Sequence, residues 1–312
     1  MGTLNSDPED SFAITLASNS QEATLVAITV VQGNVPLRHG YANAKHLLEL
    51  LGIFGDIDLA AGASTPVADR DARPEQYRWL DEKDSWERKI AAIDAPYPHE
   101  SAVETIRRCA EQYDDLVIAA IGPLTNIAAA IREHPHIVDR ISRLVVMGGA
   151  FEEPGNITPT AEFNFFMDPE AAQAVLDSGI TPVVVGLDVC HRTSLSKTQL
   201  DIIGTKSELG MFVEESCAGW LTAMEAAGWA GLHLFDSLAV AAALQPDLVS
   251  TEPVWMEIDT SQNATGGTSV AWLPNRPSGW TRPTEAVNAY VATDFDASRF
   301  KKLVEDRILT LL

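Results

Sequence analysis

The chain has 312 residues, of which 46% are hydrophobic and 21% charged, so it has the composition of a globular protein with a large core. Its formal net charge of -22 repels phosphate backbones and anionic lipids, which argues against nucleic acid and membrane surfaces as partners. No apolar run approaches the 18 residues of a membrane span, and no signal peptide is visible. The three widely spaced cysteines suggest free thiols in a reducing compartment, so we expect a cytoplasmic enzyme.

Short apolar segments rich in Val and Ile alternate with amphipathic ones along the chain. Strands are predicted over residues 24–31, 116–121, 144–147, 181–187, 254–258 and 286–292. Helices are predicted over 41–51, 101–113, 124–133, 169–178, parts of 197–245, and 298–311, with Asp168 as the N-cap of the helix at 169–178. Because the main strands are apolar without alternation, they are expected to be buried on both faces, as in an open, mostly parallel α/β sheet flanked by helices. Residues 68–99, rich in charge, Pro and Trp, are interpreted as a flap or excursion.

Ligands of open α/β sheets bind beyond the carboxyl ends of the strands, so the polar residues that follow each strand are candidates for a site. Asn34 follows the first strand, Thr125 and Asn126 follow the second, and Asp188 follows the fourth. Thr125 and Asn126, taken by themselves, are ordinary helix-capping residues.

Acidic residues crowd the turn at Asp7, Glu9 and Asp10, just before an apolar helix. Such a cluster suits a hard divalent cation, which prefers several oxygen ligands. An acidic helix N-terminus favoured by the helix dipole explains the same pattern, and on this segment alone it is the better interpretation.

Two later segments also carry polar groups in apolar surroundings. Asn156, Glu162 and Asn164 suit the donors and acceptors of a sugar diol, although turn chemistry and a surface Glu would give the same pattern. Asp236 opens an apolar helix and could be a simple N-cap, and His233 a structural histidine.

Four segments carry a family resemblance in the correct order. They are QGNVPLRHGYANAKHLLELLG, IGPLTNIAAAI, MGGAF followed by GNITPTAEFNFFMDPEAA, and FDSLAVAAALQPDLV. Together they resemble the inosine–uridine-type nucleoside hydrolase family from about Ser6 to about Val249. The resemblance implies a Rossmann-like core in a single domain, 1–312, and hydrolysis of ribonucleosides to ribose and free base, as in nucleoside catabolism or purine salvage. It also implies a homodimer or homotetramer.

The resemblance further implies one Ca²⁺ ion that binds the ribose diol and a water, and an oxocarbenium-like transition state. By position, Asp10, the carbonyl of Thr125 and Asp236 match metal ligands, and Asp10 and Asp236 count with Asp7 as catalytic residues. Matches to substrate-binding positions are Glu9, Asn34, Met147, Asn156, Glu162, Phe163, Asn164 and Phe235.

The sequence departs from the family pattern at its start. The Asp-x-Asp that ends the family's first strand is missing, so the domain lacks part of that strand. Asn5 or Asp7 would partly substitute, and Asp7 is the candidate general base. The alternative function is therefore a catalytically impaired member that binds nucleosides or ribosyl ligands without efficient turnover.

A second departure concerns the leaving base. Many members have His where this chain has Phe235, and Phe donates no proton. Stacking on an aromatic residue favours purine bases, so Phe235 indicates a modest preference for purine nucleosides. His233 is a possible displaced acid, and Trp79, Trp86 and Trp229 fall in segments that could cover the base.

Two other enzyme classes fit less well. A Mg²⁺-dependent phosphohydrolase would need a cation near the strand ends to hold phosphate, and those segments offer only Arg38. An NAD-binding fold would show Gly-x-Gly-x-x-Gly after the first strand, which is not found there.

Overall fold

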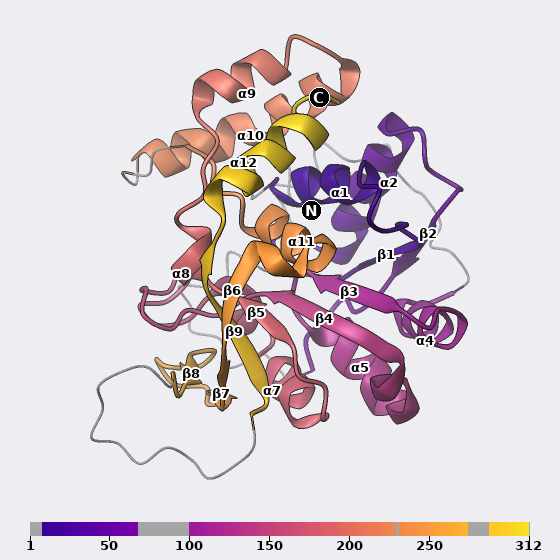
Figure 1. Ribbon diagram of the computed structural model, residues 1–312, viewed down its shortest axis with the longest axis vertical. Coiled ribbons are helices and arrows are strands. Elements are labelled where there is room, and N and C mark those ends of the chain that lie inside the picture. The colour runs from indigo at the N-terminus through magenta and orange to yellow at the C-terminus, as the bar shows by residue number, and fades with distance from the viewer. Residues whose placement is uncertain (1–7, 68–99, 227, 229–230, 274–286, 312) are drawn as a thin grey trace.

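The computed structural model describes residues 8–67, 100–226, 228, 231–273 and 287–311 (Figure 1). The proposed flap at 68–99, Asp7, and the three tryptophans at 79, 86 and 229 lie outside these residues. The chain begins with helix α1 (Asp10–Ser18), strand β1 (Ala27–Val30), helix α2 (Leu37–Leu50) and strand β2 (Asp58–Ala61). β1 and β2 pair in parallel as a two-stranded sheet.

A five-stranded sheet follows, in the order β3 (Leu116–Ala120), β4 (Ile141–Met147), β5 (Val183–Val185), β9 (Ala289–Phe295) and β6 (Val249–Val254). The first four strands run in parallel, and β6 pairs with β9 in antiparallel fashion. The predicted class, an open, mostly parallel α/β sheet, is therefore confirmed.

Helices cover both faces of the five-stranded sheet (Figure 1). One core contains Val145 and Met147 of β4 with α1, α2, α11 (Phe235–Leu244) and α12 (Ala297–Arg307). The other contains Leu144 and Val146 of β4 with α4 (Ala102–Gln112), α5 (Thr125–Glu133) and α7 (Pro169–Asp177). Successive residues of β4 thus enter opposite cores, which explains why this strand is apolar without alternation.

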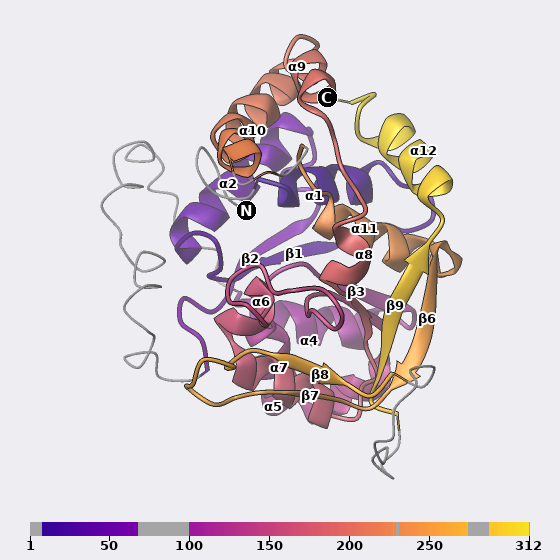
Figure 2. The same cartoon turned by 90° about the vertical axis from the view of Figure 1, so that its left-hand side faces the viewer.

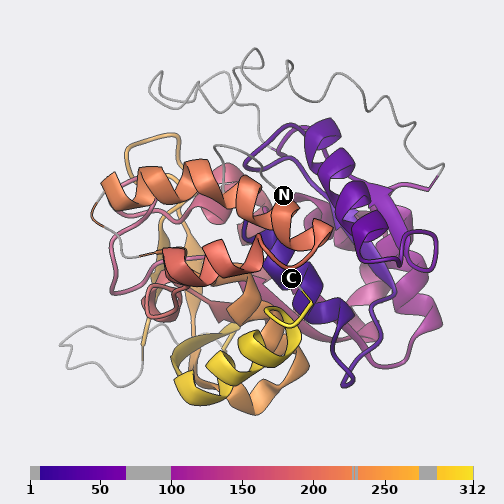
Figure 3. The same cartoon turned by 90° about the horizontal axis from the view of Figure 1, so that it is seen from above.

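Shorter elements complete the fold. They are the 3-10 helices η2 (Pro135–Arg140) and η3 (Pro246–Leu248), the helices α6 (Phe163–Met167), α8 (Leu187–Cys190), α9 (Lys197–Ile203) and α10 (Glu208–Ala226), and the antiparallel strands β7 (Met256–Ile258) and β8 (Ser269–Ala271). α9 and α10 lie above the sheet (Figures 1 and 2). Seen from above, this pair of helices lies beside α12 and reaches toward the N-terminal helices (Figure 3). None of the helices in the described ranges is long and apolar enough to span a bilayer.

The single strand predicted over 254–258 is wrong, because the chain changes partners at Trp255. β6 ends at Val254, and β7 begins at Met256 and pairs with β8 in another sheet. The side chain of Asn288 takes the place of a strand partner here: its amide oxygen accepts from Met256 N at 2.8 Å, and its nitrogen donates to Met256 O at 2.8 Å. The other predicted strands and helices are present with shifted ends; the last helix ends at Arg307.

Candidate active site

The residues that follow β1, β2 and β3 meet at one edge of the fold. The amide nitrogen of Asn126 donates to Val30 O at 3.1 Å, and its oxygen accepts from Ala63 N at 2.8 Å. Gly62 permits this approach, because a Cβ at that position would lie 2.1 Å from the Asn126 oxygen. Asn126 therefore fixes the carboxyl ends of β1 and β2 against the first turn of α5.

Glu162 holds together the loops that follow β4. Its carboxylate is 1% exposed and accepts from the main-chain nitrogens of Asn164 at 2.7 Å, of Gly149 at 3.1 Å and of Phe165 at 3.1 Å. Burial raises the pKa of Glu162 to about 7, partly opposed by these hydrogen bonds. Glu162 thus serves as the N-cap of α6 and titrates near neutrality.

Asn164 is the second residue of α6, the helix that Glu162 caps. Its amide nitrogen donates to Met147 O at 3.2 Å and lies 3.3 Å from Met147 Sδ. Nearby, the side-chain oxygen of Asn156 accepts from Phe163 N at 2.9 Å. Five of the predicted substrate-binding residues (Met147, Asn156, Glu162, Phe163 and Asn164) are therefore linked at the carboxyl end of β4.

Glu9 joins the first turns of two helices. Its buried carboxylate accepts from the main-chain nitrogens of Asp236 and Ser237, the latter at 3.0 Å, and from the Ser237 hydroxyl. A negative charge at the N-terminus of α11 is favoured by the helix dipole. Glu9 thereby brings Asp10, at the start of α1, to the same junction as Asp236, at the start of α11.

Thr125 opens α5, and its hydroxyl donates to the carboxylate of Asp168 at 2.6 Å. Asp168 is 0% exposed and also accepts from Val67 N at 2.9 Å and from Ala171 N at 3.2 Å. The last bond confirms the predicted N-cap role of Asp168 on α7. Its bond to Thr125 fixes the residue whose carbonyl is the predicted metal ligand.

Three aromatic rings gather at the start of α11. The ring of Phe235 is stacked on His233 at 5.5 Å and 13°, and His191 lies 5.6 Å from each of them. His233 Nδ1 donates to Thr193 O at 2.6 Å, because a carbonyl only accepts. Burial lowers the pKa of both histidines, so both rings are mostly neutral at pH 7.

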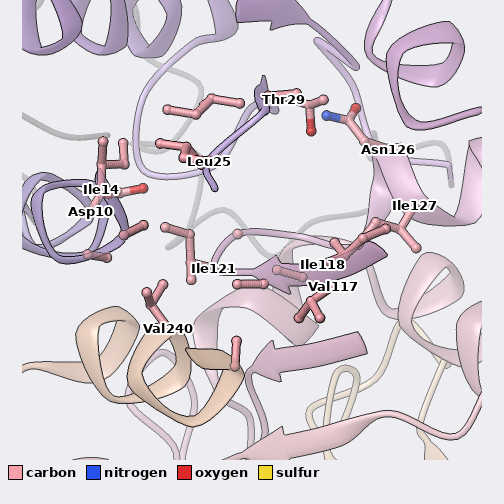
Figure 4. Close-up of a pocket in the computed structure, with 18 of the residues that line it drawn as sticks. Asp10, Ile14, Leu25, Thr29, Val117, Ile118, Ile121, Asn126, Ile127 and Val240 are labelled. Atoms are coloured by element: carbon pink, nitrogen blue, oxygen red, sulfur yellow. The ribbon is translucent and has the colours of Figure 1, made fainter. Parts of the chain in front are cut away.

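A cavity of about 870 Å³ lies between β1 and β3 (Figure 4). Asp10, Asn34, Phe163 and Asn164 line it, together with many apolar residues. Glu9, Thr125, Asp236 and Phe235 belong to the neighbouring junctions and are not among its lining residues.

The predicted metal ligands offer two carboxylates and one main-chain carbonyl, which are the hard oxygen donors that Ca²⁺ prefers. The contact of Glu9 with α11 brings together the starts of α1 and α11, which carry the two carboxylates. These residues therefore supply the type of oxygen donor that Ca²⁺ binds. Within the part of the chain that the structure describes, no three His, Cys, Asp or Glu residues gather closely enough to hold a metal ion. A complete set of ligands therefore requires further oxygen donors, such as main-chain carbonyls or Asp7.

Sequence reasoning missed the long-range contacts of three polar residues of this region. Ser237 shares the Glu9 carboxylate, His191 packs against Phe235, and Asp168 fixes Thr125. An acidic residue between the apolar FNFFM and a predicted helix was the available signal for Asp168. No local pattern pairs His191 with Phe235, which lies 44 positions further along the chain.

Comparison with known proteins agrees with this geometry. A model of the family described as inosine-uridine preferring nucleoside hydrolase matches residues 4–302. Non-specific ribonucleoside hydrolase RihC of Klebsiella pneumoniae subsp. pneumoniae is 32% identical over 304 residues, which cover 96% of this chain and 95% of that protein. Pyrimidine-specific ribonucleoside hydrolase RihA of Citrobacter koseri is 32% identical over 316 residues, covering 96% and 94%.

A solved structure, the purine-preferring ribonucleoside hydrolase from Gardnerella vaginalis, superposes with a TM-score of 0.82 at 30% identity and covers 99% of this chain and 97% of that one. Fold and sequence thus agree on an enzyme of the nucleoside hydrolase class. The chain belongs to the inosine-uridine preferring nucleoside hydrolase family. The family, the fold and the enzyme class predicted from the four motifs are confirmed.

Proposed function

We propose that this enzyme hydrolyses the N-glycosidic bond of ribonucleosides with the help of Ca²⁺ held by Asp10, the Thr125 carbonyl and Asp236. The observation that carries the proposal is the cavity between β1 and β3, whose lining includes Asp10, Asn34 and Asn164, in a member of this family. When bound, the ion supplies positive charge that grips the ribose diol and lowers the pKa of a water molecule.

The protein's own contribution is to hold the sugar in a fixed orientation. Because the amide nitrogen of Asn164 is engaged on Met147 O, its oxygen is the group that would accept from a ribose hydroxyl. Glu162 fixes the backbone around Asn164, and Asn34 and Phe163 complete the polar and apolar sides of the sugar pocket. Asp7 is the candidate general base, and Asn156 and Met147 support the sugar pocket through their bonds to Phe163 and Asn164.

Ribose release separates this proposal from the alternative, a member that binds ribosyl ligands without efficient turnover. Inosine, guanosine, uridine and cytidine would each be incubated with the enzyme in Ca²⁺, and again after chelation. We expect Ca²⁺-dependent release of ribose, and a loss of at least 100-fold in Asp10→Asn. Asp201→Asn, an exposed carboxylate paired with Lys197, is the matched control. No turnover with any of the four, together with measurable ribose binding, would favour the alternative.

The base is proposed to be a purine by modest preference. Phe235 supplies a stacked aromatic face and no acidic proton, and burial keeps His233 and His191 mostly neutral. The relatives differ in this respect, since their names describe non-specific, pyrimidine-specific and purine-preferring enzymes. Comparison of kcat/KM for inosine and uridine tests the preference directly.

Two further proposals concern the compartment and the oligomeric state of the enzyme. All three cysteines are buried and none of them forms a disulfide, which suits a reducing compartment such as the cytoplasm. A homodimer or homotetramer is expected from the family resemblance, and light scattering after size-exclusion chromatography measures it.

A further inference from the structure

The carboxylate of Asp188 holds the loop that follows β4. One of its oxygens accepts from Phe151 N at 3.0 Å, and the other accepts from Glu152 N at 2.7 Å. Asp188 lies in α8, directly after β5, so these bonds join the carboxyl ends of two neighbouring strands. Hydrogen bonds to a charged acceptor are roughly twice as strong as neutral ones, so Asp188 is well suited to fix this backbone. No step of the proposed hydrolysis uses its carboxylate.

Side chains also hold the first two nitrogens of this loop. Gly149 N donates to the carboxylate of Glu162 at 3.1 Å. Ser269 Oγ accepts from Ala150 N at 3.0 Å and donates to Ala150 O at 3.0 Å. The successive N–H groups of residues 149–152 therefore all bond to side-chain oxygens, which come from three separate parts of the chain. Such a loop has a fixed backbone although it belongs to no helix or strand.

The loop is also packed closely against the start of α8. A Cβ on Gly186 would lie 2.8 Å from Phe151 Cε2 and 3.0 Å from Gly149 O, closer than a side chain tolerates. Leu187 N donates to the same carbonyl oxygen at 2.9 Å. The loop therefore has no space to move toward α8, and the carboxylate of Asp188 keeps it from moving away.

The two ends of this loop reach the two sides of the proposed substrate site. At its start, Gly149 bonds to Glu162, the carboxylate that fixes the backbone on the sugar side. Just beyond its other end, the carboxylate of Glu153 lies 3.9 Å from His191 Nδ1. The ring of His191 packs against Phe235, the residue proposed to stack on the base, with 5.6 Å between the ring centroids. The loop thus connects the sugar side with the base side.

We propose that Asp188 is a positioning residue that keeps the sugar side and the base side of the site in a fixed relative position. This inference rests on the proposed function, because the ribose and the base of a nucleoside define the two sides. Without the carboxylate, Glu153 would shift relative to His191 at one end of the loop. Gly149 would shift relative to Glu162 at the other end. The scissile bond joins the two groups being held, and a misplacement of about 1 Å can lower the rate by about 100-fold.

Three variants test the two ends of the loop separately. Asp188→Asn keeps the shape of the side chain but turns an NH₂ group toward a main-chain N–H, which releases the loop. Ser269→Ala removes the partner of Ala150, next to the sugar side. Glu153→Gln removes the charge that faces His191, on the base side. Only the first of these variants should affect both sides.

Two readouts report the two sides. Inhibition by ribose reports the sugar side, and the ratio of kcat/KM for inosine to that for uridine reports the base side. In Asp188→Asn we expect kcat/KM for inosine to fall about 10-fold, the inhibition constant of ribose to rise about 5-fold and the ratio to fall about 3-fold. Ser269→Ala should raise only the inhibition constant, and Glu153→Gln should lower only the ratio, each by about 2-fold.

A merely structural role would give a different result. A smaller folded fraction in Asp188→Asn would lower the maximal rate and leave the ribose constant and the substrate ratio unchanged, and that outcome overturns the proposal. A change in only one of the two readouts overturns it as well. Should Asp188→Asn not fold, the other two variants decide, and the proposal fails if neither Ser269→Ala nor Glu153→Gln moves its own readout.

Hydrogen exchange with mass spectrometry tests the same contact without catalysis. Peptides that span residues 149–153 should exchange about 10-fold faster in Asp188→Asn, while β3 and β9 keep the wild-type rate. Equal exchange in the two proteins overturns the positioning role, whatever the activity. If the wild type released no ribose from any nucleoside, the proposed function would fail, and ribose binding together with exchange would still decide whether Asp188 positions the loop.

Discussion

The hydroxyl of Thr125 donates to the fully buried carboxylate of Asp168 at 2.6 Å, which joins the start of α5 to the start of α7. Because Asp168 also accepts from Val67 N and Ala171 N, its charge is satisfied by three donors from separate parts of the chain. Such a carboxylate fixes the position of the Thr125 main chain, on which the proposed metal site depends.

Replacing Asp168 with Asn should therefore destabilise the enzyme by about 2 kcal/mol, because one oxygen is lost and an NH₂ group faces buried donors. Thr125→Val should cost about 1–2 kcal/mol, while Thr125→Ser keeps the hydroxyl and most of the stability. Urea denaturation of the single and double variants measures the coupling between the two residues. Strictly additive losses would mean that the bond does not stabilise the fold.

Glu9 offers a second test, at the junction of α1 and α11. Glu9→Ala leaves two buried N–H groups and a hydroxyl without their acceptor, so we expect a loss of about 3 kcal/mol. Ser237→Ala removes a single donor and should cost about 1 kcal/mol. Both are measured by urea denaturation, with ribose release assayed in the folded variants. If Glu9→Ala were no more costly than Ser237→Ala, the carboxylate would not be the element that joins the helices.

Local sequence pattern predicts most of the helices and strands, but it does not predict which distant residues they contact. The apolar segments of β3 and β4, the cap at Asp168 and the family motifs were all read correctly, because each depends on local pattern. Glu9 was predicted from the family pattern to hold ribose, and nothing in the sequence indicated that its carboxylate bonds to the backbone of α11, 227 positions away. That partner is set by how α1 packs on α11, which no local spacing reveals.

The same limit applies to the strand ends. The segment 254–258 is predicted as one strand because it is mostly apolar. Only the hydrogen bonds of Asn288 show that the chain passes from one sheet to another there. Likewise, no local pattern predicts the cavity between β1 and β3, because the cavity depends on how several helices pack around these strands.

Glu162 predicts how stability depends on pH. Its pKa in the folded state is raised to about 7 by burial, above the ordinary 4.5, so the folded state retains a proton that the unfolded state releases. The contribution of Glu162 to stability is therefore fully present below about pH 4.5, is lost between 4.5 and 7, and is constant above that range, for a total near 3 kcal/mol.

Urea denaturation at pH 5, 6, 7 and 8 measures this contribution as the difference between the wild type and Glu162→Gln. The wild type should lose stability relative to the variant by up to about 1.4 kcal/mol per pH unit between pH 5 and 7. A constant difference across this range would show that Glu162 titrates outside it.

Phe235 provides the test of base preference, since its ring packs against both His233 and His191 at the start of α11. Pyrimidines are poor leaving groups without a proton donor, and Phe supplies none. Phe235→His should raise kcat/KM for uridine by on the order of 10-fold or more, relative to inosine, with activity falling as the new imidazole loses its proton. Phe235→Leu is the matched control: it removes the aromatic face without adding an acid, so hydrolysis of inosine should fall and that of uridine should not rise. If the two variants changed both substrates by the same factor, the side chain at 235 would act on packing alone, and the proposed purine preference would lose its physical basis.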